Sequence, residues 1–189
     1  MNTPAHLLIG LAVCSRRHVP RSGRAAAAGS LLPDLSLYLL AGGALFVLQI
    51  PPARVFGELY YSDAWQAVFA VDNSAILWGA GLAAALWWRA TAAAAFAVAG
   101  LLHIVTDLPL HAGDGRPHFW PLSDAVIDSP VSYWDSAYHA ALVAPVEAGA
   151  CAVAAWVLWR RFGTAAPRFG IAVLMAMELW VVRQWLLFF

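Results

Sequence analysis

The sequence contains no lysine, and its eleven basic residues are all arginine. Eleven acidic residues balance them, so the formal net charge is zero. A nucleic-acid-binding surface needs a basic surplus, which this chain does not have. Charged residues make up only 12% of the 189 positions, about half the share usual in a soluble globular domain. The two cysteines, Cys14 and Cys151, lie far apart in apolar stretches, which excludes a disulfide framework.

Hydrophobic residues, in contrast, account for 62% of the chain and occur in long runs. This pattern excludes a soluble enzyme and a disordered chain, and it predicts an integral membrane protein. Five runs can be followed along the sequence: residues 25–50, 73–88, 90–110, 137–159 and 169–189. Residues 4–14 are apolar but too short to cross alone, since a crossing takes about 20 residues. We therefore expect an all-α fold over residues 1–189, a single domain with four to five transmembrane helices and a short N-terminal helix.

The arginines predict the orientation of these helices. Arg16 to Arg24 follow the short segment 4–14, Arg89 lies between the runs 73–88 and 90–110, and Arg160 to Arg168 precede the last run, 169–189. Loops rich in arginine stay in the cytoplasm. The connections at 51–72 and 111–136, and the C-terminus, are then expected to face outward. Because the positive charges follow the first segment instead of preceding it, that segment does not have the order of a secretory signal.

The densest group of ionisable residues is the ladder His103, Asp107 and His111. Residues four apart project from one face of a helix, although Pro109 is expected to end or bend this helix. Two imidazoles and a carboxylate at this spacing suit Zn²⁺ or a similar divalent ion. A His–Asp hydrogen bond that fixes helix packing, or a proton relay, would fit the same spacing.

Asp34 is the only charged residue in the run 25–50, and Pro33 precedes it. We expect the proline to break the crossing at membrane depth. With no lysine available, a metal ion or a histidine is the least costly partner for this acid. Alternatively, the carboxylate caps the half-helix that follows.

Further polar residues fall on the outward half of the expected topology. Asp135 and His139 form a second pair four residues apart, at the start of the run 137–159, and Glu147 lies two turns further along. Each is a candidate general base or a partner of the metal ligands, and His139 could equally be a polar anchor at the start of a helix. One outward half holds His6, His103, Asp107, His111, His118, Asp135 and His139, which favours a single polar, metal-capable site.

Four motifs follow one another along residues 1–145: Pro4-Ala-His6, Gly29 to Asp34, His103 to Asp107, and Phe119-Trp120-Pro121. In this order they resemble the bacterial membrane-bound metal-dependent hydrolases. More distantly, the ladder is similar to the zinc ligands of soluble zinc-dependent phospholipases C, all-helical enzymes that cleave phosphodiester bonds. The resemblance implies a zinc site with five ligands: His6, Asp34, His103, Asp107 and His111.

The chain departs from this family at Asn73. The family has a Thr-His-Ser segment where this chain has Asp72-Asn73-Ser74, so a weak ligand replaces a histidine, although Asp72 could substitute. Relatives are sometimes labelled cobalamin-biosynthesis proteins of the cobyric-acid-synthase type. A phosphate-binding loop for that chemistry needs a lysine, which this chain lacks.

These observations predict a metal-dependent hydrolase of the bacterial inner membrane. Its zinc site would face the periplasm, as would the C-terminus, and a phospholipid or another phosphoester would be its substrate. Membrane lipids are then its expected partners. The alternative is a non-catalytic membrane subunit that keeps the hydrolase fold and binds a membrane-protein partner. The departure at Asn73 and the ten tryptophans, several of them at helix ends, favour this alternative.

Overall fold

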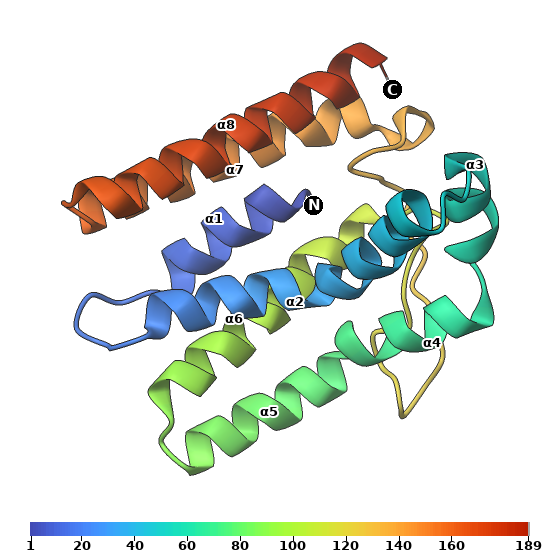
Figure 1. Ribbon diagram of the computed structural model, residues 1–189. Helices are drawn as coiled ribbons and strands as arrows, with labels where there is room; N and C mark the ends of the chain where they lie inside the picture. The colour runs from blue at the N-terminus through green and yellow to red at the C-terminus, as the bar shows by residue number, and fades with distance from the viewer. Residues whose placement is uncertain (189) are drawn as a thin grey trace.

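The computed structural model describes residues 1–188 and is all-helical (Figure 1). Five of its helical segments are long and apolar enough to cross a membrane, and one shorter apolar helix precedes them. The prediction of an all-α chain with four to five crossings and a short N-terminal helix is therefore confirmed. The long segments are Ser22–Val47, Asp63–Trp87, Thr91–Leu110, Ala140–Arg161 and Ala165–Leu187.

The helices follow one another with short connections, except for one long loop between residues 111 and 135. A π-helical turn, Gly43–Val47, extends α2 (Ser22–Gly42), and a second, Val55–Leu59, follows α3 (Pro52–Arg54). Two 3-10 turns, Leu108–Leu110 and Ser136–Tyr138, flank the long loop. The α-helices are α1 (Thr3–Cys14), α2 (Ser22–Gly42), α3 (Pro52–Arg54), α4 (Asp63–Asp72), α5 (Ala75–Trp87), α6 (Thr91–Asp107), α7 (Ala140–Arg161) and α8 (Ala165–Phe188).

The second crossing begins earlier than the hydrophobic runs predict. Residues 63–72 were expected in an outward loop, but they form α4 and join α5 in one long segment. The two helices are separated at Asn73 and Ser74. The Ser74 hydroxyl accepts a hydrogen bond from the Leu77 amide at 3.0 Å and so caps α5. A side-chain cap of this kind satisfies an amide at the start of a helix, which explains why the break falls at this position.

The short helix α1 reaches only about halfway along the bundle, and its first residues lie among the other helices (Figure 1). Pro4 occupies the first turn of α1, where a missing amide hydrogen has no cost. Ala5 and Leu8 are fully buried with Cys151 and Leu158 of α7 in one apolar cluster. Because α1 also packs against α2, α6 and α8, it lies in the centre of the bundle and carries His6 with it.

Small residues allow α2 and α6 to approach closely. A Cβ atom on Gly29 of α2 would lie 2.1 Å from the Phe96 carbonyl oxygen of α6 and 3.1 Å from the Cβ of Ala99. Small side chains at such contacts are typical of membrane helix pairs. This approach places Ser30 and Asp34 of α2 opposite His103 of α6.

Pro33 does not break α2, contrary to the prediction. The helix runs from Ser22 to Gly42 with Pro33 in its interior, fully buried. The proline removes the amide that would bond the Gly29 carbonyl one turn earlier, and an interior proline of this kind is tolerated in membrane helices. The nearby carbonyls of Ser30 and Pro33 contact His103 and Asn73. Asp34 consequently lies within the helix and does not cap a half-helix.

The arginine-bearing turns lie together at one end of the bundle. The connections α1–α2, α5–α6 and α7–α8 share that end, and the long loop lies at the other (Figure 1). Arg161 of α7 donates a hydrogen bond of 2.7 Å to the Ser15 carbonyl, which joins two of these turns. The arginines of these three turns therefore lie at the same end of the bundle, as the sequence predicts. Which compartment that face meets stays a prediction.

Candidate metal centre

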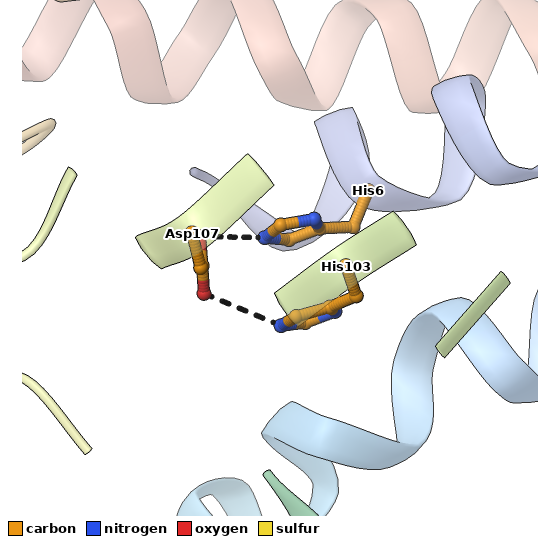
Figure 2. A group of neighbouring side chains, drawn as sticks. All are labelled: His6, His103 and Asp107. Carbon is orange, nitrogen blue, oxygen red and sulfur yellow. Dashed lines mark hydrogen bonds and ion pairs between the residues drawn. The ribbon is translucent and has the colours of Figure 1, made fainter. Parts of the chain in front are cut away.

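Asp107, the last residue of α6, lies at the centre of a buried group of histidines. Its Oδ1 lies 3.0 Å from Nε2 of His6, and its Oδ2 lies 3.3 Å from Nε2 of His103 (Figure 2). The main-chain nitrogen of Met1 also contacts Oδ1. The ligand atoms of His6, His103 and Asp107 all lie within 4.8 Å of one another, so this group could hold a metal ion.

The orientation of the His103 ring is set by Nδ1, the nitrogen that does not face Asp107. Nδ1 lies 2.7 Å from the Ser30 carbonyl oxygen, which can only accept, so Nδ1 carries the hydrogen and donates it. In the neutral ring, Nε2 then has a free lone pair. Nε2 makes no hydrogen bond within residues 1–188, and it faces Oδ2 of Asp107 at 3.3 Å and Oδ1 of Asp34 at 3.6 Å. Histidines that bind metals are commonly oriented by a carbonyl in this way.

His6 joins this group from α1. Its Nε2 lies 3.0 Å from Oδ1 of Asp107, which can only accept, so Nε2 donates this hydrogen bond. Its Nδ1 faces the Thr106 hydroxyl at 3.4 Å. A metal ion bound at Nε2 would take the place of the hydrogen on that atom. The rings of His6 and His103 are stacked, with centroids 3.5 Å apart and planes 8° apart, so both Nε2 atoms point the same way (Figure 2).

Two carboxylates, Asp34 and Asp107, meet the histidines here, and the amino group of Met1 supplies one positive charge beside Oδ1 of Asp107. The second positive charge can be a proton on one of the two rings or a divalent ion shared by His6, His103 and Asp107. Protons on both rings are unfavourable, because two imidazolium rings stacked at 3.5 Å repel each other in a low-dielectric interior. Two imidazoles and one carboxylate are also a ligand set that Zn²⁺ accepts. The residues present therefore fit a metal ion.

Asp34 contacts the same group from α2. Its Oδ1 faces His103, and its Oδ2 accepts a hydrogen bond from the Thr3 hydroxyl. The Tyr38 hydroxyl lies 2.6 Å from that of Thr3. Asp34 thus has a histidine neighbour, one of the two partners expected for it. Whether it also binds a metal stays a prediction.

His111 reaches the group from the long loop, just beyond the 3-10 turn at Pro109. Its Nε2 lies 3.3 Å from Oδ2 of Asp107, and its Nδ1 lies 3.1 Å from Oδ1 of Asp114. Burial alone would lower the pKa of His111, but the two carboxylates outweigh it and hold the pKa above its ordinary value. The predicted ladder of His103, Asp107 and His111 is thus brought together, with α6 ending before Pro109 as expected.

Several residues that support this group were not predicted from the sequence. Asp114 is buried beside His111 and accepts a 2.9 Å hydrogen bond from the Trp134 indole. Tyr133 packs its ring 5.3 Å from that of His111, and burial, followed by the charge of Asp107, raises the pKa of Tyr133 well above its ordinary value. The spacing of three residues between His111 and Asp114 was the available signal. Nothing in the sequence marked Thr106 or the Ser30 carbonyl as part of this group.

Arg116, in the long loop, was also not predicted from the sequence. It is 6% exposed, and its guanidinium carbon lies 4.2 Å from the centre of the Phe69 ring. Its Nη1 atom has no hydrogen-bond partner within the described chain, and no carboxylate there lies within 4.0 Å of it. A buried arginine is normally paired, so this side chain is available to an anion.

Asn73, which stands where the hydrolases that the sequence resembles have a histidine, contacts backbone carbonyls of two helices. Its Nδ2 donates to the carbonyl oxygens of Pro33 and Phe69, each at 3.1 Å, and lies 2.8 Å from Oδ1 of Asp72. The amide thereby fastens α4 to α2. Asn73 and Asp72 are not members of the His6–His103–Asp107 group.

The three candidate bases are dispersed. Asp135 accepts a 2.8 Å hydrogen bond from the Ala137 amide and caps a 3-10 turn. His139 has a φ of 69°, and α7 begins only at Ala140, so Asp135 and His139 do not share a helical face as expected. Glu147 is buried, and its Oε1 accepts a 2.6 Å hydrogen bond from the Asn2 amide. A catalytic role for these three residues stays a prediction.

Comparison with known proteins adds no relative, since no family model, curated protein or solved structure matches the chain. The fold and the site together define a class. The chain is a multi-pass helical membrane protein in which a buried His-His-Asp group could hold a metal ion.

Proposed function

We propose that this protein is a metal-dependent hydrolase of the bacterial inner membrane. Zinc is its proposed ion, and a phospholipid or another phosphoester is its proposed substrate, cleaved on the periplasmic side. The observation that carries the proposal is the buried group of His6, His103 and Asp107, whose ligand atoms all lie within 4.8 Å of one another. The motif order described above, which resembles the membrane-bound metal-dependent hydrolases, supports the same function.

In this proposal His6, His103 and Asp107 hold the ion, with Asp34 and His111 as further ligands or as partners that position them. A bound divalent ion would polarise a phosphoryl oxygen and lower the pKa of a water molecule toward neutrality. During hydrolysis the water oxygen would bond to phosphorus, and the ester P–O bond would break with its electron pair on the leaving oxygen. The water proton would pass to a base and from the base to that leaving oxygen. Glu147 is the best supported base of the three candidates, because its Oε2 has no hydrogen-bond partner in the described part of the chain.

Arg116 supports a phosphoester in preference to a neutral ester. It belongs to the same loop as His111 and Asp114, it is buried, and its Nη1 is unpaired within residues 1–188. Guanidinium groups bind phosphate oxygens with charge-assisted hydrogen bonds. A phosphate beside this loop would therefore satisfy an otherwise costly buried charge.

Metal analysis of detergent-purified protein tests the proposal. We expect about one zinc ion per chain in the wild type, because the group offers one cluster of ligands, and a loss of that ion in Asp107→Asn. Asp63→Asn is the matched control, since Asp63 is exposed at the start of α4. Phosphodiester and phospholipid hydrolysis would then follow the metal content. A metal-free wild type that is as stable as Asp107→Asn would refute the proposal.

A second candidate, a non-catalytic subunit, is favoured by Asn73. Its amide nitrogen is occupied by the carbonyls of α2 and α4, so the position serves packing where the family has a histidine. In that case the protein would bind a metal ion without turnover and would co-purify with a membrane-protein partner. Full metal content with no hydrolysis of any phosphoester would favour this candidate.

A further inference from the structure

A large apolar groove opens between α6 and α7. Its volume is about 720 Å³. Val105 of α6 forms one wall, and Leu142 and Val146 of α7 form the other. These three side chains are between 65% and 73% exposed. The groove exists because α1 packs against both α6 and α7 and separates them, yet is too short to fill the space beside it (Figure 1).

The inner end of the groove meets the candidate metal centre. Two residues that line the groove touch this centre: Met1 contacts Asp107, and the Thr106 hydroxyl contacts His6. Apart from Thr106, Glu147 and His139, the groove is lined by apolar residues. It is therefore an apolar channel with polar groups at the place where it reaches the histidines.

The length of the groove matches one leaflet of a bilayer. It follows α7 from His139 to Ala150, and at 1.5 Å per residue this is about 16 Å. The hydrocarbon core of a bilayer is about 30 Å thick, so the groove covers about half of it, the depth of one lipid chain. At this depth the surroundings are hydrocarbon and supply no water. The occupant with the right chemistry is thus an acyl chain.

We propose that the groove holds an acyl chain of a membrane lipid and brings the phosphoester of that lipid to His6, His103 and Asp107. This inference rests on the proposed hydrolase function for its catalytic part, and it narrows the substrate from phosphoesters in general to phospholipids. The acyl chain lies between Val105 and Val146, and the headgroup lies toward Thr106 and His139, at the end of the groove nearer the long loop. Entry is sideways from the bilayer, along the exposed valines.

The test uses full-length protein in nanodiscs that contain a diacyl phospholipid with a photoactivatable acyl chain. After irradiation, mass spectrometry maps the cross-linked residues. Val146→Trp fills the groove, and Val153→Trp is its control, since Val153 is a lipid-exposed valine of α7 outside the groove. We expect cross-links concentrated at Val105, Leu142 and Val146 in the wild type and in Val153→Trp, and their loss in Val146→Trp. Thermal unfolding shows whether both variants are folded.

Metal content and hydrolysis of a water-soluble phosphoester are measured on the same samples. Val146→Trp should lose phospholipid hydrolysis and keep both its metal and the hydrolysis of the soluble ester. Cross-links spread evenly over all lipid-facing helices, or equal in the two tryptophan variants, would overturn the proposal that the groove holds an acyl chain. Groove-specific cross-links in a protein that binds no metal and cleaves nothing would instead overturn the hydrolase and leave the lipid site standing.

Discussion

Nε2 of His103 lies 3.3 Å from Oδ2 of Asp107, one helical turn further along α6, while Nδ1 of the same ring is fixed by the Ser30 carbonyl. In the neutral ring, Nε2 therefore has a lone pair that faces a buried carboxylate. This relationship makes the region between the two residues a place for a cation.

Removing the metal should destabilise the wild type. A ligand that binds only the folded state adds stability in proportion to the logarithm of its concentration, about 2.7 kcal/mol at one hundred times its Kd. We expect a chelator to lower the thermal midpoint of wild-type protein in detergent and to have no such effect on His103→Ala. Added Zn²⁺ should restore the wild-type midpoint. Equal midpoints with and without chelator would speak against a bound ion.

The contact between α2 and α6 should be intolerant of a single methyl group. Gly29→Ala places a Cβ 2.1 Å from the Phe96 carbonyl oxygen, which cannot move without shifting the helix. Overpacking of this kind costs about 1–3 kcal/mol. We expect a lower thermal midpoint, together with weaker metal binding, because Ser30 and Asp34 are displaced from His103. Gly42→Ala is the control, since nothing lies within 4 Å of its added Cβ, and a Gly29→Ala midpoint equal to that of Gly42→Ala would contradict the close approach.

Replacing Asn73 should lower the stability of the protein and leave its metal binding unchanged. Asn73→Ala removes the side-chain hydrogen bonds to the carbonyl oxygens of Pro33 and Phe69, although the backbone amide of residue 73 still bonds the Phe69 carbonyl. A hydrogen bond contributes about 0.5–1.5 kcal/mol to stability. We therefore expect a lower thermal midpoint with unchanged metal content in the protein that remains folded. If the purified variant loses its metal and keeps its midpoint, Asn73 or its neighbour Asp72 is a ligand after all.

Arg116 should control the binding of phosphate. Arg116→Met keeps most of the side-chain volume over Phe69 but removes the charge. A hydrogen bond to a charged group contributes about 1.5–3 kcal/mol, so inhibition by inorganic phosphate should weaken about tenfold to a hundredfold. Metal content should stay the same. An unchanged inhibition constant would place the phosphate elsewhere.

The orientation in the membrane can be tested with added cysteines. In a background without Cys14 and Cys151, Ser123→Cys in the long loop should react in intact cells with a maleimide that does not cross membranes. Gly163→Cys, in the turn between α7 and α8, should react only after the cells are lysed. The opposite pattern would place the arginine-bearing turns outside and contradict the positive-inside prediction.

The sequence predicted the number of crossings and the contact between His103 and Asp107, because both follow from local spacing along one chain segment. It also grouped His6 and Asp34 with them, but only through topology and resemblance. Their actual approach depends on Gly29 and on the depth of α1, which no local pattern encodes. The expected break at Pro33 was wrong, because α2 continues through this residue to Gly42 and membrane helices tolerate an interior proline.

Arg116, Asp114 and Thr106 were missed for a related reason. A loop residue carries no periodicity, so nothing in its spacing shows whether it is buried. Arg116 became notable only once Phe69 was seen beneath it and no carboxylate was found beside it in the described residues. The chemistry of this protein therefore depends on loop burial, which the fold determines and the local sequence does not.

The half-length of α1 has an electrostatic consequence. Its first turn lies among Asp34, Asp107 and Glu147, and the Asn2 amide, the Thr3 hydroxyl and His6 already contact these acids. The aligned peptide dipoles of a helix place roughly half a positive charge at its N-terminal end. Because α1 stops inside the bundle, that positive end faces the carboxylates where hydrocarbon would otherwise make their ionisation costly. A chain without lysine thus gains positive potential at membrane depth from its backbone.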